Sequence, residues 1–328
     1  FSSYFFILIP AGHIWKFVTL AYIPPTIAGV VLAYRKKYLL GGIVTALFIA
    51  LQIQSNHIQM SYYFMFVILF FVGAYFEDAY KKKELPHFFK ASGVLALAAV
   101  VGVCINISNL YHTYEYSKET MRGKSELKQE GAAASQTSSG LDRDYITNWS
   151  YGIGETLTLL VPNVKGGGSG STMSQSEVAM AKANPMYNGI YSQLPQYFGE
   201  QPWTAGPVYV GAFVMFLFVL GCFIVKGPLK WALLGATIFS ILLSWGKNFM
   251  GLTDFFIDYV PMYNKFRAVS SILVIAEFTI PLLAIFALKE ILSKPDMLKQ
   301  EKNCRGVIAA LVLTAGVALI LAVAPGAF

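Results

Sequence analysis

Long apolar runs, separated by short polar segments, recur along most of the chain. A helix needs about 20 apolar residues to cross the roughly 30 Å hydrocarbon core of a bilayer. The pattern therefore predicts eight membrane-spanning helices, and residues 1–9 form an apolar stretch too short to span. The predicted spans are residues 14–34, 38–54, 60–76, 88–108, 206–225, 229–246, 268–288 and 306–324.

The basic residues gather in every second connection between these spans. The segments 35–37, 81–90, 226–230 and 289–305 together hold more than half of the 25 lysines and arginines. Cytoplasmic loops carry such an excess, so these connections are predicted to be cytoplasmic. The long segment on the opposite side is then external. The chain divides into an N-terminal transmembrane bundle (1–108), an external loop domain (109–205) and a C-terminal bundle of four spans (206–328).

Composition supports a polytopic membrane protein and excludes two other classes. Hydrophobic residues make up 55% of the chain and charged residues 13%, against about 25% charged in soluble domains. Aromatic residues at 15% exclude a disordered chain. The net charge of +7 follows the loop alternation, so it marks orientation and predicts no nucleic-acid partner.

Metal and nucleophile chemistry find little support in the sequence. The chain has four histidines and three cysteines, and none of the cysteines falls in residues 109–205. No zinc-type spacing, glycine-rich phosphate loop or serine nucleophile elbow is present. We therefore expect no metal site, and we expect any active site to combine carboxylates, basic residues and aromatics on the external face.

The stretch 140–155 is the densest in such residues. Asp142, Asp144 and Glu155 are weak candidates for catalysis, because a carboxylate can deprotonate a hydroxyl acceptor or hold a cation. The alternative is a solvated loop in which Asp and Arg form an exposed ion pair of little energy. The aromatic candidates for stacking on a sugar are Trp149, Tyr151 and Trp203.

Amide side chains form a second group at the outer end of a predicted span. Gln52, Asn56 and Gln59 follow i, i+4, i+7 spacing, which predicts that they share one helix face, with His57 beside them. Polar groups in lipid must find partners. Asn56, His57 and Gln59 could line a cavity for a sugar or phosphate, and interhelical hydrogen bonding is the equally supported alternative.

Two further sites depend on single charges near or within a span. Lys265 and Arg267 precede the span at 268–288, where a lipid phosphate would lie, and arginine binds phosphate bidentately. The alternative is that both side chains snorkel without a ligand. Glu277 lies near the middle of the same span. We favour a structural role for it, hydrogen-bonded to backbone freed by Pro281, over proton coupling.

Four motifs occur in order along the chain. They are Asn56-His-Ile-Gln-Met-Ser-Tyr-Tyr63, Gly140-Leu-Asp-Arg-Asp-Tyr with Trp149-Ser-Tyr-Gly, Leu159-Leu-Val-Pro-Asn163, and Tyr263-Asn-Lys-Phe-Arg267. Together they resemble the bacterial YfhO-like membrane proteins. That family is similar to the GT-C glycosyltransferases, which take a sugar from a polyprenyl-phosphate carrier on the external side of the membrane.

The resemblance implies a GT-C-like helical bundle in the bacterial cytoplasmic membrane, with residues 109–205 external. It implies a polyprenyl-phosphate sugar as donor and an envelope glycan or polymer as acceptor, and it leaves a divalent cation open as cofactor. Such enzymes carry an acidic motif after their first span, whereas the first acid here is Glu77, in a cytoplasmic loop. We therefore expect a fragment whose catalytic carboxylate lies upstream of Phe1.

Three functions follow in order of preference. The first is a glycosyltransferase in which Lys265 and Arg267 stabilise the departing lipid phosphate. The second is a transporter or flippase of lipid-linked envelope precursors, with Glu277 as the coupling residue. The third is a non-catalytic scaffold of envelope assembly.

Overall fold

The computed structural model describes residues 2–120, 122–123 and 140–324, so most of the predicted linker at 132–140 lies outside it. Within these ranges the regular elements are all helices, and extended pairing is confined to an isolated bridge between Thr172 and Pro195. This confirms the all-α prediction for the described residues. The longer α-helices are α2 (Ile14–Ala21), α3 (Ile23–Tyr34), α4 (Tyr38–Gln54), α5 (Ile58–Lys82), α6 (Leu85–Ile105), α7 (Ile107–Lys118), α11 (Ala212–Ile224), α12 (Pro228–Ser244), α13 (Met250–Tyr259), α14 (Val274–Ser293), α15 (Glu301–Leu311) and α16 (Val317–Val323).

Helices occupy all eight predicted spans, although they do not all reach the same length. Five are long and apolar enough to cross a membrane: Ile14–Tyr34, Ile58–Lys82, Leu85–Ile105, Val269–Ser293 and Glu301–Val323. A sixth is added if α12 and α13 count as one broken span. The helices α4 and α11 are apolar but shorter. The chain is thus a multi-pass membrane protein by helix length and hydropathy.

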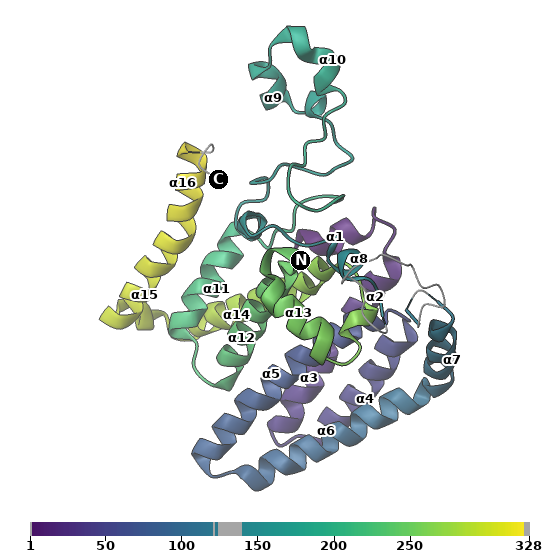
Figure 1. The fold of residues 1–328 in the computed structure, drawn as a ribbon. Helices are drawn as coiled ribbons and strands as arrows, with labels where there is room; N and C mark the ends of the chain where they lie inside the picture. Colours follow the sequence, from purple (N-terminus) through teal and green to yellow (C-terminus); the bar gives the residue numbers. More distant parts are fainter. Residues whose placement is uncertain (1, 121, 124–139, 325–328) are drawn as a thin grey trace.

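The N-terminal helices pack through small residues. α3 lies against α4, and α4 lies against α6 (Figure 1). A Cβ atom on Gly29 would lie 2.4 Å from Thr45 Oγ1, and one on Gly41 would lie 2.5 Å from Ala33 N. Close backbone approach of this kind supplies van der Waals packing where lipid removes the hydrophobic driving force between helices.

The C-terminal helices form the more buried part of the molecule. α14 packs against α11 and α12, and α12 also packs against α5, which joins the two groups of helices. Two thirds of the apolar stretch in Val269–Ser293 is buried, at 67%. α15 lies against α11 on the outside of this group (Figure 1). The site described below lies at the end of the molecule where α14 begins.

A sharp bend after α12 shapes that end. The helical segment Gly246–Tyr259, which ends in α13, is bent by 108° from α12 after a break at Trp245. Gly246 has φ +47°, and a Cβ atom there would lie 2.1 Å from Ser150 Oγ, so only glycine fits. The bend thus places α13 beside the loop that contains residue 150.

Residues 140–211, which include most of the described part of the predicted external loop domain (109–205), contain short helices and long irregular segments. The chain passes through α8 (Arg143–Thr147) and the 3₁₀-helix η1 (Gly154–Leu159) close to the bundle. It then extends outward to α9 (Glu177–Lys182) and α10 (Asn188–Tyr191), which stand away from the spans (Figure 1). Both ends of this segment contact the bundle: Tyr151 N donates to Ser244 O near its start, and Tyr209 N donates to Ser3 Oγ near its end.

Candidate functional site

Backbone pairing joins two segments that the sequence analysis treated separately. Leu141 N donates to Asn264 O at 2.9 Å, Ala268 N to Ile146 O at 3.2 Å, and Ser270 N to Trp149 O at 3.0 Å. Leu141 and Ile146 anchor this contact because both are buried in the core. The segments 140–150 and 264–270 therefore lie side by side, which brings two of the four motifs together.

The short helix α8 fixes the start of this loop. The Asp142 carboxylate caps it, accepting hydrogen bonds from Asp144 N at 2.9 Å and Tyr145 N at 3.4 Å. Arg143 forms ion pairs with Asp258 at 2.6 Å and with Asp254, both on α13. Arg143 therefore pairs with carboxylates on α13, and it does not form the exposed ion pair within the loop that was the alternative prediction. Of the three acidic candidates, Asp142 acts as a cap and Asp144 is exposed.

Arg267 occupies the centre of the joined segments. Its guanidinium lies 5.3 Å from the ring centroid of Tyr145 and 5.8 Å from that of Trp149. Its Nη1 donates to Tyr145 Oη at 2.6 Å, and its carbonyl accepts from Gln59 Nε2 at 2.7 Å. Arg267 makes no ion pair within the described ranges. Its charge is therefore held in place by aromatic rings without being neutralised.

Lys16 and His13 lie within electrostatic reach of Arg267, and both also act on His57. Burial is the main cause that lowers the pKa of His57 to about 4, and the neighbouring Lys16 and His13 contribute to this shift. The pKa of His13 is lowered by burial and then by Lys16 and Arg267. Every charged neighbour that acts on these two histidines is thus basic, which makes the site attractive to an anion.

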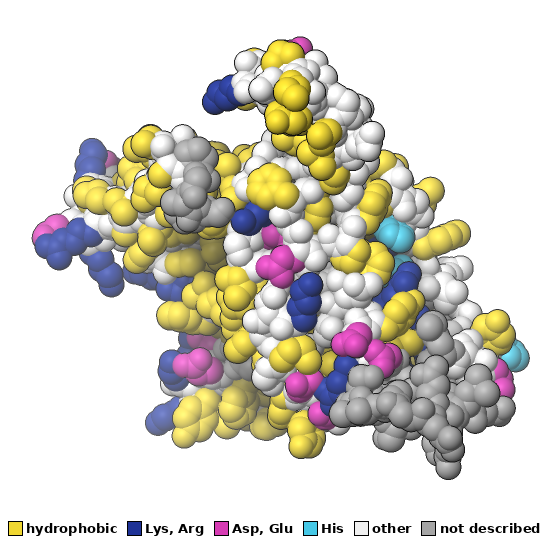
Figure 2. All heavy atoms as spheres, turned by 45° about the horizontal axis from the view of Figure 1, so that its top comes forward, with side chains coloured by type: hydrophobic (Ala, Val, Ile, Leu, Met, Phe, Trp, Pro, Cys, Tyr) yellow, Lys and Arg dark blue, Asp and Glu magenta, His cyan; other side chains and the backbone are white. Residues whose placement is uncertain are grey.

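Lys16 and His57 also carry polar atoms in protected positions. Lys16 is 9% exposed, on α2, and its Nζ donates to Ser271 Oγ at 3.4 Å. His57 Nδ1 is buried and has no hydrogen-bond partner among the described residues. Basic, acidic and histidine side chains gather on this face of the molecule in Figure 2. We define the outer cluster as His13, Lys16, His57, Tyr145, Trp149 and Arg267.

The sequence analysis missed two members of the outer cluster. Lys16 was detectable, because it is the one charged residue in the predicted span 14–34 and intramembrane charges are functional by default. His13 carried no comparable signal, since it precedes that span in an unremarkable polar turn.

Of the remaining predicted site residues, Trp203 lies beside the outer cluster and Lys265 bonds elsewhere. Trp149 Nε1 donates to Trp203 O at 3.2 Å, which places the exposed Trp203 beside the outer cluster. Lys265 instead donates from Nζ to Arg122 O at 2.7 Å, and burial lowers its pKa. The predicted pairing of Lys265 with Arg267 at one phosphate is therefore not seen, because the Lys265 ammonium is bound to another backbone segment.

Glu155 and Tyr151 are buried, and both line a small internal cavity between residues 151–167 and 197–208. Glu155 is 2% exposed and accepts hydrogen bonds from Gly152 N at 2.6 Å, Tyr197 Oη at 2.5 Å and Glu200 N at 3.3 Å. Tyr151 is equally buried, with its hydroxyl 2.5 Å from Thr158 Oγ1. These contacts make both side chains supports of the loop, while their roles in catalysis and sugar stacking stay predictions.

The predicted amide face is also corrected. α4 ends at Gln54 and α5 begins at Ile58, so Gln52 and Gln59 lie on different helices. Asn56 is exposed in the turn between them and adopts φ +56°, a left-handed conformation that asparagine tolerates. Among the three amides, Gln59 reaches the outer cluster, through its bond to the Arg267 carbonyl.

Glu277 lies in α14 and is 1% exposed. Neither carboxylate oxygen has a hydrogen-bond partner in the described part of the chain, so the expected bond to backbone near Pro281 is not formed. Ser2, Tyr4 and Tyr151 lie within its electrostatic reach. The side chain is thus a buried polar group that the outer cluster does not include.

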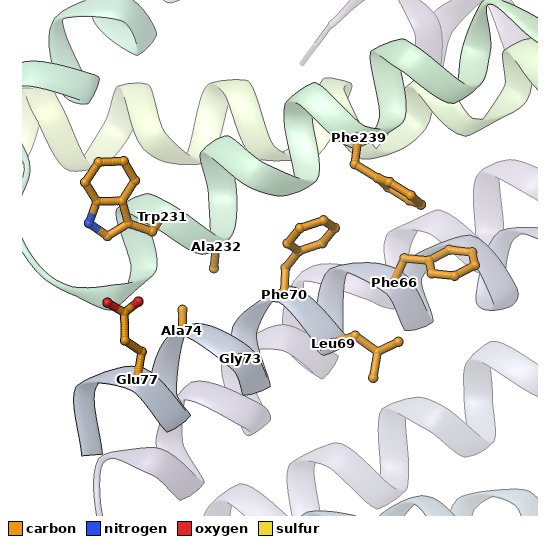
Figure 3. A pocket seen from close by; sticks show the side chains of 9 residues that line it. All are labelled: Phe66, Leu69, Phe70, Gly73, Ala74, Glu77, Trp231, Ala232 and Phe239. Atoms are coloured by element: carbon orange, nitrogen blue, oxygen red, sulfur yellow. The ribbon is translucent and has the colours of Figure 1, made fainter. Parts of the chain in front are cut away.

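An apolar groove runs along α5 below the outer cluster. Its cavity of about 440 Å³ lies between α5 and α12, with Phe70 and Phe239 facing each other across it (Figure 3). Glu77 and Trp231 lie at its far end. The groove begins at Phe66, two helical turns from Gln59, so α5 connects the cationic site to an apolar surface.

Among the described residues, no group of three or more His, Cys, Asp and Glu side chains is placed to hold a metal ion. No protein family, curated protein or solved structure matches the chain. The geometry of the outer cluster therefore has to carry the functional argument.

Proposed function

We propose that the outer cluster binds the phosphate of a lipid-linked sugar, and that the protein transfers this sugar to an envelope acceptor as a GT-C-type glycosyltransferase. The observation that carries the proposal is the Arg267 guanidinium, which lies over Tyr145 and Trp149 near Lys16 and His13 and makes no ion pair with any described residue. A planar guanidinium recognises phosphate through two parallel hydrogen bonds, and such charge-assisted bonds are the strong ones.

The two histidines complement this cation. Both are neutral near pH 7 in the free protein because burial and basic neighbours lower their pKa values. A bound phosphate would reverse that effect, since an opposite charge nearby favours the imidazolium form. Anion binding is therefore expected to draw protons onto His57 and His13.

The surroundings of the cations favour a ligand with sugar and hydrocarbon parts. Trp149 and the exposed Trp203 lie next to each other, and aromatic faces stack on sugar rings. The apolar groove along α5 offers a surface for a lipid chain on the helix whose outer end bonds Arg267. A soluble sugar phosphate would leave that groove unused.

The transfer itself forms a bond from an acceptor oxygen to the sugar C1 while the bond from C1 to the phosphate oxygen breaks. The acceptor proton leaves with a base, and the electron pair of the broken bond stays on the phosphate. The outer cluster stabilises the negative charge that develops there, which is the usual role of fixed cations in group transfer.

The test uses the complete protein in nanodiscs with polyprenyl-phosphate sugars, following loss of donor, release of free polyprenyl phosphate and donor binding. Arg267→Ala should weaken donor binding about tenfold or more, because a charge-assisted hydrogen bond contributes about 1.5–3 kcal/mol. Lys247→Ala is the matched control, since Lys247 is an exposed cation in the same end of the molecule. Equal donor binding by both variants would refute the phosphate assignment.

Transport of a lipid-linked precursor is the second candidate, favoured by two observations. Glu277 is a buried carboxylate without a partner in the described ranges, and α12 and α13 form a broken helix pair. Discontinuous helices and intramembrane acids are features of transporters. The same assay separates the two candidates, because a transporter binds donor through Arg267 but releases no free polyprenyl phosphate.

A further inference from the structure

A second cavity lies at the opposite end of the helices from the outer cluster. It has a volume of about 510 Å³ and is enclosed by the end of α3, the end of α5, the start of α6 and the connection from α11 to α12. This end carries the basic loops that the charge alternation assigns to the cytoplasm. We call this space the inner cavity.

The charges that line the inner cavity do not cancel. Its two carboxylates are already paired, Glu84 with Lys36 at 3.1 Å and Asp78 with Lys82 at 2.7 Å. Arg35 and Lys226 also line the cavity, and neither makes an ion pair within the described ranges. The cavity thus has an excess of two positive charges, contributed by two connections between helices that are far apart in sequence.

An ordered aromatic wall closes the apolar side. Tyr34 stacks on Tyr75 with ring centroids 4.4 Å apart and on Phe88 with centroids 5.6 Å apart. His87 is held at the start of α6 by Tyr38 Oη at 2.6 Å and the Tyr34 carbonyl at 2.9 Å. The side chains that shape this wall are therefore fixed by stacking and hydrogen bonds before any ligand arrives.

We propose that the inner cavity binds the phosphate headgroup of an anionic phospholipid, with Arg35 and Lys226 as its cationic ligands. The cavity lies where the candidate spans Ile14–Tyr34 and Ile58–Lys82 end and Leu85–Ile105 begins, which is the level of lipid headgroups. Basic pockets between helices on the cytoplasmic side suit such headgroups. The unpaired cations face the phosphate, and the aromatic wall contacts the glycerol and the start of an acyl chain.

This site is independent of the proposed transferase function. It shares no residue with the outer cluster, and it requires neither a sugar nor a polyprenyl chain. A negative result in the donor assay would therefore not contradict the lipid site. A negative result in the lipid test would likewise not contradict the transferase proposal.

The test measures lipid retention by the intact protein in detergent, using native mass spectrometry with phosphatidylglycerol or phosphatidylcholine at equal concentration. The wild type should retain phosphatidylglycerol preferentially. The double variant Arg35→Gln/Lys226→Gln should bind it about tenfold more weakly or worse, because two charge-assisted contacts are lost. Lys226→Gln alone, in an exposed connection, should give a several-fold loss and tests the site if the double variant does not fold.

The matched control is Lys37→Gln/Lys83→Gln, which removes the same charge from exposed lysines at the same end that do not line the cavity. Retained preference in this control supports a built site. An equal loss in both double variants would show a diffuse charge effect and overturn the proposal. Binding of soluble glycerol phosphate as strong as that of the lipid would overturn the lipid assignment and identify a free phosphate ligand.

Discussion

The two ends of α5 both lie among basic side chains, but the bonding of those side chains differs. At the inner end, Lys81 and Lys82 form exposed pairs with the acids one turn earlier on the same helix. At the outer end, Gln59 bonds the carbonyl of Arg267, whose charge lies over aromatic rings and has no acidic partner among the described residues. Arg35 and Lys226, which line the inner cavity, make no ion pair within the described ranges, and neither do the exposed Lys37 and Lys83 at the same end.

The difference teaches that charge alone does not identify a site in this protein. Exposed helix pairs contribute little energy and hold no particular geometry. A cation held by rings, or buried as Lys16 is, stays in place and keeps its charge available to a ligand. Substitutions that remove one interacting side chain at a time can test this distinction between exposed ion pairs and fixed side chains.

The largest effect is expected for Glu155→Ala in the loop that supports the outer cluster. The substitution leaves two backbone N–H groups and the Tyr197 hydroxyl without their acceptor. An unsatisfied buried donor costs about 1–3 kcal/mol, so we expect a loss of about 3 kcal/mol or more in unfolding free energy. Chemical denaturation in detergent, with protease sensitivity of the loop domain, measures it.

Asp144→Ala is the matched control for that prediction, because Asp144 is an exposed carboxylate in the same loop. Its effect should stay within about 0.5 kcal/mol. If Glu155→Ala and Asp144→Ala unfold alike, the buried hydrogen bonds of Glu155 do not support the loop.

An intermediate effect is expected from the pH dependence of binding at His57. Its pKa is about 4 in the free protein and rises when an anion binds, so affinity should increase as pH falls from 7.5 to 5.5. We expect a gain of about three- to tenfold by proton linkage. A polyprenyl-phosphate sugar is a suitable probe because its phosphodiester does not titrate in this range, and His57→Gln should flatten the profile.

The same pKa predicts the opposite trend for stability without ligand. The unfolded chain takes up a proton at His57 near pH 6.5, whereas the folded protein does so only near pH 4. The contribution of neutral His57 to stability is therefore complete above pH 6.5 and declines as pH falls toward 4. Affinity that falls with acidification, with no unfolding, would contradict the anion site.

The smallest effect is expected for Lys81→Gln at the inner end. The Lys81–Glu77 pair is exposed, with side-chain exposures of 70% and 59%. Exposed pairs of this spacing contribute about 0.3–0.5 kcal/mol, so stability should change by no more than that. A loss above about 1 kcal/mol in unfolding free energy, measured by the same denaturation, would contradict this prediction, because it would show that the exposed Lys81–Glu77 pair stabilises the fold.

Much of the fold could be predicted from residue pattern because apolar runs of bilayer length form helices wherever they occur. Helices accordingly occur at all eight predicted positions. The prediction that Gln52 and Gln59 share one helix face was wrong, because the helix is broken between Gln54 and Ile58. The site was predicted in part. Arg267 contacts Gln59 and Trp149, whereas Tyr151 and Glu155 are buried and Lys265 bonds to another segment.

The sequence by itself determined that this chain is helical, apolar and multi-pass, because those properties depend on the composition of each segment and the thickness of a bilayer. Only the tertiary structure decided which charges are paired and which are left for a ligand. Pairing depends on contacts such as Arg143 with α13 and Lys16 with Ser271, between residues more than 100 positions apart. No local pattern records such contacts, since they arise when separate helices pack.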